Sequence, residues 1–118
     1  MAHHKGFGLV EVADTYVDIV AVGSKLKFAG EKQRYTVRAS NRFFSVCTKP
    51  LNIHKTVLYT VIDWHHQIRG TENLVFGMGA ETDDECEEML QRLTNAKSDI
   101  SHRNWSKLLL ERYDPPTK

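Results

Sequence analysis

The sequence has little of the material from which several common classes of protein are built. It holds two cysteines, too few for a disulfide framework, and we expect Cys47 and Cys86 to be buried, reduced thiols. No hydrophobic run approaches the roughly 20 residues of a membrane-spanning helix, and the polar N-terminus has no apolar signal-peptide core. These absences predict a protein of a reducing cytoplasm that has no membrane partner.

The motifs of many enzymes and metal sites are missing as well. The chain has no Cys-x-x-Cys pair, no His-x-x-x-His spacing, no phosphate-binding glycine loop and no nucleophile elbow. We therefore predict no metal and no cofactor. Two catalytic pairs without a family signature remain: Asp63 with His65 or His66 as an acid–base pair, and Cys47 with His54 as nucleophile and base. An enzyme, using Asp63 and one of its neighbouring histidines, is the third choice of function.

Charge is distributed unevenly, although the whole chain has a net charge of only +1. Residues 25–55 hold eight Lys or Arg and one acid, Glu31, whereas residues 56–99 hold nine Asp or Glu and three Lys or Arg. A basic face on β structure attracts nucleic-acid phosphates, although such side chains also decorate the solvent face of any sheet. The residues predicted to bind nucleic acid are Lys25, Lys27, Lys32, Arg34, Arg38, Arg42 and Lys49.

Alternating polar and apolar residues predict several short strands. Residues 25–28 alternate cleanly, and residues 33–39 and 42–48 are a hairpin candidate. Pro50 is expected to end the second arm, because proline cannot donate to a central ladder. In the first arm, the alternation places three apolar side chains on one face: Tyr35, Val37 and Ala39.

Longer hydrophobic stretches lie before and after this hairpin. Residues 9–22 have strand-like composition, and the nearly continuous hydrophobicity of residues 56–64 predicts a central strand covered on both faces. Residues 65–73 are polar and suggest a loop. The tail at residues 101–113 suits a helix or a closing strand, with a slight preference for the strand.

One helix is predicted over residues 82–94. Thr82 and Glu85 form a capping box, and Asp83 and Asp84 occupy the first turn, where the helix dipole favours anions. The acidic residues suggest either a solvated face, which we favour, or a contact for a basic partner. An apolar stripe at helical spacing is formed by Cys86, Met89, Leu90 and Leu93.

These elements predict one α+β domain at residues 9–113, with a flexible N-terminus at residues 1–8 and a flexible tail at residues 114–118. Five or six short strands joined by tight turns suit a small, strongly bent antiparallel sheet of the SH3-like or half-barrel kind, with one amphipathic helix. Bending of this kind also limits the exposed edges of the sheet.

Several short motifs stand out along residues 24–104. They are Lys27-Phe28, Cys47-Thr48-Lys49-Pro50, Arg69-Gly70, Ser101-x-Arg103-Asn104, and the runs at residues 31–37, 57–63 and 73–77. With these motifs the sequence resembles a family of small uncharacterised proteins encoded by bacteriophages and prophages. The resemblance implies a setting, the cytoplasm of an infected or lysogenic bacterium, and it transfers no catalytic role.

The first functional hypothesis is a non-enzymatic accessory protein that binds a macromolecule, nucleic acid first, through its basic β face. The alternative is a protein-interaction module, for example an inhibitor of a host factor. That module would use the acidic helix or the loop of Arg69 and Asn73, in which the arginine either clamps an anion or ties the loop to Asp63.

Overall fold

The computed structural model describes residues 10–12, 15–17, 20–51, 56–66, 68–72, 83–96 and 104–116. Several subjects of the sequence analysis lie outside these ranges, among them the N-terminus at residues 1–8, His54, the run at residues 73–77 with Asn73, and Thr82 of the predicted capping box. Within the described ranges the chain forms nine strands, the α-helix α1 (Asp83–Asn95) and the 3-10 helix η2 (Trp64–His66).

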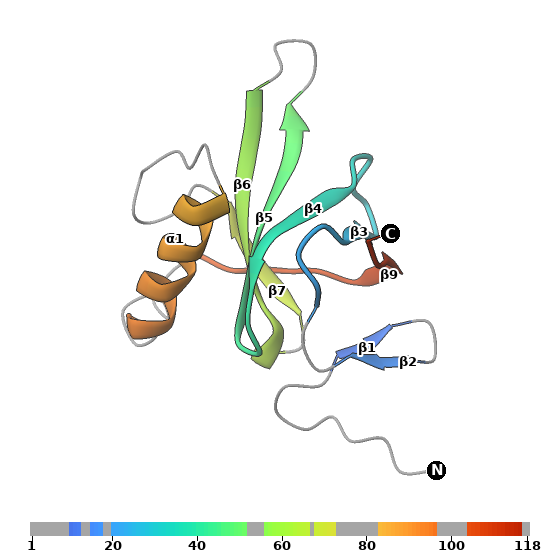
Figure 1. The fold of residues 1–118 in the computed structure, drawn as a ribbon. Helices are drawn as coiled ribbons and strands as arrows, with labels where there is room; N and C mark the ends of the chain where they lie inside the picture. Colours follow the sequence, from blue (N-terminus) through green and yellow to red (C-terminus); the bar gives the residue numbers. More distant parts are fainter. Residues whose placement is uncertain are drawn as a thin grey trace.

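A curled antiparallel sheet of seven strands forms the body of the protein (Figure 1). A separate two-stranded sheet pairs β1 (Val10–Val12) with β2 (Thr15–Val17). The spatial order in the large sheet is β8 (Ser106–Lys107), β7 (Arg69–Glu72), β6 (Thr56–Asp63), β5 (Phe44–Leu51), β4 (Tyr35–Ser40), β3 (Lys25–Phe28) and β9 (Leu110–Asp114).

One chain segment supplies both edges of this sheet. β8 pairs with β7 and β9 pairs with β3, yet only Leu108 and Leu109 separate β8 from β9. The amide of Leu108 donates to the carbonyl of Ile68, and the carbonyl of Leu109 accepts from the amide of Ala29, so even the connection bonds to both sides. The predicted half-barrel is therefore confirmed in this coarse form, as is the preference for strand in the tail.

The expected number of strands was too low, because the polar segment at residues 69–72 was read as a loop. Arg-Gly-Thr-Glu has no β pattern of its own, and pairing with β6 and β8 holds it in the sheet. β6 itself is central, as predicted. Val61 packs on one face of the sheet and Ile62 on the other, and each is at most 1% exposed.

Two hydrophobic cores lie on the two faces of the sheet. The inner core fills the concave side, and its members are Val20, Leu26, Phe28, Tyr35, Val37, Cys47, Ile62 and Trp64. The helix-side core lies between the sheet and α1, and its members are Ala39, Phe44, Val46, Val61, Cys86, Met89, Leu90 and Leu93. Both cysteines are free and buried, as predicted.

A β-bulge transfers β4 from one core to the other. The register pairs Val37 with Cys47 but Ala39 with Val46, so Arg38 is the extra residue. An extra residue reverses the alternation of side chains along a strand. The prediction that Ala39 shares a face with Tyr35 and Val37 was therefore wrong, because Ala39 packs under the helix.

The prediction that Pro50 ends the hairpin arm was also wrong, because β5 continues to Leu51. The last described pair between β4 and β5 is Thr36 with Thr48. Pro50 lies beyond that pair, so its missing N–H deprives β4 of no hydrogen bond.

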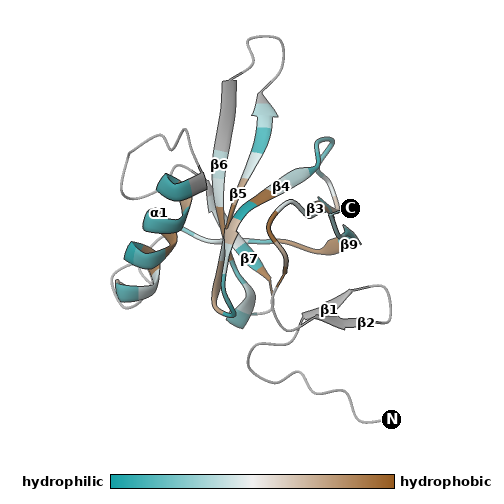
Figure 2. Cartoon of the chain, in the orientation of Figure 1, coloured by the Kyte–Doolittle hydropathy of each residue, from teal (hydrophilic) through white to brown (hydrophobic). Residues whose placement is uncertain are grey.

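The helix forms where it was predicted, with a shift of one residue at each end. Its four apolar residues are all at most 5% exposed, and Figure 2 shows its outer side as hydrophilic. Asn41 fixes the β4–β5 turn, because its side-chain oxygen accepts hydrogen bonds from the backbone amides of Phe43 and Phe44. Its side-chain Nδ2 donates a hydrogen bond to the hydroxyl of Thr94 at 2.9 Å. The turn therefore anchors the last turn of α1.

No helix in the described part of the chain is long and apolar enough to cross a membrane.

Two leucines test the assignment of the faces. Leu26 is fully buried in the inner core. Leu109 is 65% exposed and lies on the closing segment, the stretch from β8 to β9 that pairs with both β7 and β3. We predict that Leu26→Ala lowers the free energy of unfolding by about 2–5 kcal/mol, because it leaves a cavity, and that Leu109→Ala changes it by less than about 0.5 kcal/mol. Urea denaturation of both variants measures the difference. Equal effects would contradict the described burial.

Candidate functional site

Three of the predicted phosphate-binding residues lie together on the outward face of β3 and its neighbours. Lys25 and Lys27 alternate with the buried Leu26 and Phe28, so their side chains leave the sheet on the side away from the inner core. Arg34 precedes β4, and its guanidinium reaches Asp114 on β9 at 2.5 Å. The arginine side chain therefore crosses β3, which lies between β4 and β9 in the sheet.

β9 adds a fourth cation to this surface. Arg112 pairs with Lys27 across the ladder, and Asp114 pairs with Lys25. Directly paired residues of neighbouring strands share a face. We call the surface formed by Lys25, Lys27, Arg34 and Arg112 the basic face.

Two carboxylates are interspersed among these cations. Asp114 accepts from Arg34 and, at 3.0 Å, from Arg112, and Glu111 lies 3.5 Å from Lys27. The hydrogen bond from Arg112, together with the charges of both arginines, lowers the pKa of Asp114. Lys25 donates to the hydroxyl of Thr36 at 2.8 Å. The basic face therefore combines four positive charges with two negative ones.

The other four predicted residues lie elsewhere. Lys32 and Arg42 are exposed in the turns that follow β3 and β4, and Arg38 is the bulge residue of β4. Lys49 bonds to Glu31 at 2.8 Å and lies 5.2 Å from the ring centre of Tyr35, which belongs to the inner core. The hydrogen bond from Lys49 lowers the pKa of Glu31. Lys49 thus belongs to the rim of the concave side.

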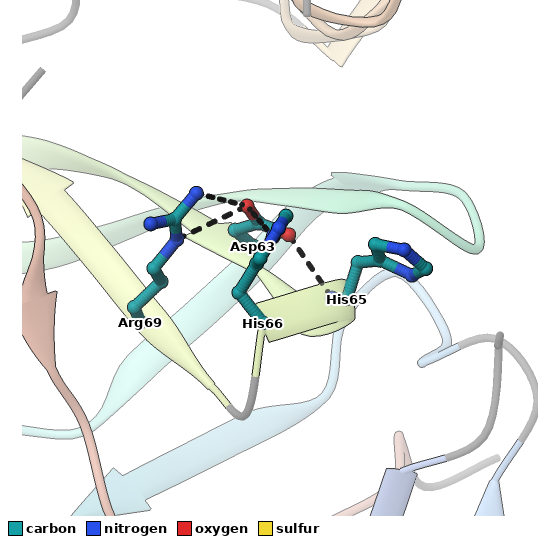
Figure 3. Close-up of polar contacts among 4 residues, drawn as sticks. All are labelled: Asp63, His65, His66 and Arg69. Atoms are coloured by element: carbon teal, nitrogen blue, oxygen red, sulfur yellow. Dashed lines mark hydrogen bonds and ion pairs between the residues drawn. The ribbon is translucent and has the colours of Figure 1, made fainter. Parts of the chain in front are cut away.

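A second polar cluster surrounds Asp63 at the end of β6 (Figure 3). Its side chain is only 6% exposed, and its Oδ2 accepts from His66 Nδ1 at 2.8 Å and from Arg69 Nε and Nη2 at 3.2 and 3.1 Å. Its Oδ1 accepts from the amide of His65 at 3.0 Å. We call Asp63, His66 and Arg69 the Asp63 centre.

The local chain geometry explains how these side chains meet. Asp63 ends β6 and accepts from the amide two residues on, the usual behaviour of aspartate at the start of a turn. Because the strand ends at Asp63, His65 and His66 both lie in η2, where their rings stand edge to face at 5.1 Å.

The return of the chain from η2 to β7 is strained and tightly packed. Ile68 has a φ of 56°, a left-handed conformation that is rare for a β-branched residue. Gly70 is closely packed, since a Cβ there would lie 2.7 Å from Leu108 Cδ1, so that Leu108 would have to shift, and 3.3 Å from the carbonyl oxygen of Val61. This turn brings Arg69 back beside Asp63, its partner in the β6–β7 ladder.

Arg69 ties its loop to Asp63, which was one of its two predicted roles. The guanidinium also stacks over the indole of Trp105 at 4.5 Å. Trp105 in turn packs against the helix-side core. Arg69 is thus held between a buried carboxylate and an aromatic ring, and the role of anion clamp stays a prediction.

The remaining chemical candidates have different environments. Cys47 is buried, and desolvation raises the pKa of its thiol, which disfavours the thiolate needed for nucleophilic attack. No group of three or more His, Cys, Asp or Glu among the described residues is placed to hold a metal ion.

Sequence reasoning missed the contribution of the tail to both sites. Arg112, Asp114, Trp105 and Lys107 were left without a role because residues 101–113 fitted two secondary structures. The alternation of Lys107 and Leu109 with the apolar Leu108 and Leu110 was the available signal for β8. It gave no signal for Arg112, which reaches the outward face only because the register between β3 and β9 shifts at Lys27 and Phe28 and makes Glu111 the extra residue.

Comparisons of the chain with protein-family models, with curated proteins and with solved structures gave no match.

The Tyr35 hydroxyl makes stability depend on pH in the alkaline range. Burial raises the pKa of Tyr35 to about 12, from a usual value near 10. Between these values the unfolded chain has lost the proton that the folded protein keeps, so stability falls as the pH rises from about 10 to 12. Between pH 8 and pH 11 the pH crosses about one of the two pKa units, so we predict that the free energy of unfolding falls by about 1–1.5 kcal/mol more in the wild type than in Tyr35→Phe. Denaturant unfolding at pH 8 and pH 11 measures it, and identical pH profiles for both proteins would contradict the assignment.

Substitutions of Asp63 and Glu111 compare how much the Asp63 centre and the basic face each contribute to the free energy of unfolding. Asp63→Asn is predicted to lower the free energy of unfolding by roughly 2–3 kcal/mol, because Arg69 and His66 lose a buried anionic acceptor. Glu111→Gln removes a half-exposed partner of Lys27 and is predicted to cost less than about 1 kcal/mol. Thermal unfolding of both variants gives the comparison. A larger loss for Glu111→Gln would refute it.

Proposed function

We propose that this protein binds nucleic acid through the basic face. The observation that carries the proposal is the convergence of Lys25, Lys27, Arg34 and Arg112 from three parts of the chain onto one outward surface of β3 and β9. A surface of this kind attracts phosphates and releases their condensed counterions when it binds them. The bacteriophage resemblance suggests the setting, an accessory protein in a bacterial cytoplasm.

The carboxylates on the basic face do not prevent binding. The side chains of Arg34, Arg112 and Asp114 are 45%, 63% and 31% exposed. Exposed ion pairs contribute roughly 0–1 kcal/mol, so a phosphate can replace Asp114 as the partner of an arginine at little loss. Bidentate bonding of arginine to phosphate then adds geometric selectivity.

The acidic helix lies away from the basic face and does not neutralise it. α1 packs on β4 and β5, which are central in the strand order, whereas the basic face lies on β3 and β9, the two strands that follow β4 at one end of that order (Figure 1). Its exposed acidic residues include Asp84, Glu87 and Glu88. A polyanion therefore meets a molecule with an acidic surface and a separate basic surface, which favours binding to the basic one.

Titration of a labelled single-stranded oligonucleotide tests the proposal. We predict that the affinity falls with rising salt, with a log–log slope as steep as about −3 if all four cations meet phosphates. A slope near zero, or no binding at low salt, would overturn the proposal.

Matched substitutions locate the interface. Arg34→Glu and Arg92→Glu change the net charge equally, but Arg92 lies on the exposed face of α1. We predict that Arg34→Glu weakens binding about tenfold or more and flattens the salt slope, whereas Arg92→Glu has a small effect. Asp114→Asn is predicted to strengthen binding more than Asp84→Asn does. Equal effects within each pair would show that net charge, and no particular face, governs binding.

A further inference from the structure

We propose that His66 is the proton-transfer residue of an RNA-cleaving site, and that Asp63 is its positioning residue. This inference rests on the proposed binding of nucleic acid and adds a substrate class and a reaction to it. The sequence left two histidines as candidates, and the structure selects one of them.

The geometry of the Asp63–His66 pair suits proton transfer. Asp63 Oδ2 lies 2.8 Å from His66 Nδ1, and the carboxylate is 6% exposed while the imidazole is 54% exposed. A carboxylate acceptor places the proton of the neutral ring on Nδ1 and leaves the lone pair of Nε2 available as a base. The same carboxylate stabilises the imidazolium that forms when Nε2 takes up a proton. His65 contacts Asp63 through its backbone amide, and Figure 3 shows its ring directed away from the carboxylate.

The backbone beside the Asp63 centre is strained at Ile68. The left-handed Ile68 costs roughly 1–2 kcal/mol, and such strain is concentrated at functional sites. Arg69, two-fold bonded to Asp63 and stacked on Trp105, fixes the carboxylate from the other side. The base is thus presented at the surface by a support that is rigid and buried.

The basic face leads to this centre. Asp63 pairs with Arg69, and Arg69 pairs with Lys107, so the three residues form one row across β6, β7 and β8 on one face. The outward side of the closing segment then continues from Lys107 through the exposed Leu109 to Arg112, about 17 Å further along. A strand bound along this side is held by Arg112 at one end and by Lys107 beside the Asp63 centre.

The reaction that these groups support is attack by the RNA on itself. His66 Nε2 takes the proton of a ribose 2′-hydroxyl, and the 2′-oxygen forms a bond to the adjacent phosphorus. The bond from phosphorus to the 5′-oxygen of the next nucleotide breaks, and that oxygen takes a proton from water. The hydroxide left by the water takes the proton held by His66, which restores the neutral imidazole. The products are a 2′,3′-cyclic phosphate and a 5′-hydroxyl, and no oxidant or reductant is consumed. Lys107 and the guanidinium of Arg69 supply positive charge near the phosphorane.

Three oligonucleotides of one sequence separate binding from cleavage: RNA, 2′-O-methyl RNA and DNA. We predict that the protein binds RNA and 2′-O-methyl RNA and cleaves only RNA, to the cyclic phosphate. If it binds both and cleaves neither, this inference fails and the proposed function stands. If it binds neither, both fail. Cleavage of the 2′-O-methyl strand or of DNA would also overturn the inference.

The neighbouring histidine provides a comparison. His66→Gln is predicted to lower kcat at least about 100-fold with little change in KM. His65→Gln removes a ring that packs on His66 but keeps the backbone amide on Asp63, so we predict that it lowers kcat less than about tenfold. Arg34→Glu is predicted to raise KM and to recover its rate at saturating RNA, because it acts on binding alone. Equal rates for His66→Gln and wild type, from identical preparations, would refute the assignment.

Discussion

The architecture depends on one constraint, the pairing of a single chain segment with both edges of the sheet. β8 and β9 are separated by two residues, yet they bond to β7 and β3, which lie at opposite ends of the strand order. A sheet whose edges are held by one short segment has to curl, and the curl encloses the inner core. The segment also covers the hydrogen-bonding edges of β7 and β3, which would otherwise invite pairing with other chains.

The same closure places the two chemical surfaces of the protein. Arg112 and Asp114 reach Lys25, Lys27 and Arg34 only because β9 pairs with β3. Lys107 and Trp105 reach Arg69 only because β8 pairs with β7. The basic face and the Asp63 centre are therefore connected by one stretch of backbone, and its outward side chains alternate with those that seal the inner core.

Patterns that depend on near neighbours predicted much of this structure. The capping box and apolar stripe placed α1 to within one residue, and alternation placed β3 at residues 25–28. Contacts distant in sequence could not be predicted in this way. The bulge at Arg38 moves Ala39 between cores, and only the register with β5 reveals it. β7 has no β pattern of its own, and the partners of Arg34 and Lys27 come from residues 111–114. The Asp63–Arg69 contact was foreseen as one of two alternatives, because the residues are only six apart.

An NMR titration tests the central claim most directly, that closure of the sheet assembles one nucleic-acid-binding surface from β3 and β9. Backbone amide shifts would be followed as single-stranded RNA is added to the 15N-labelled protein. The account predicts that the largest changes fall jointly on residues 25–28 and 110–114, with those of α1 nearly unchanged. Changes confined to α1, or to β3 without β9, would contradict it.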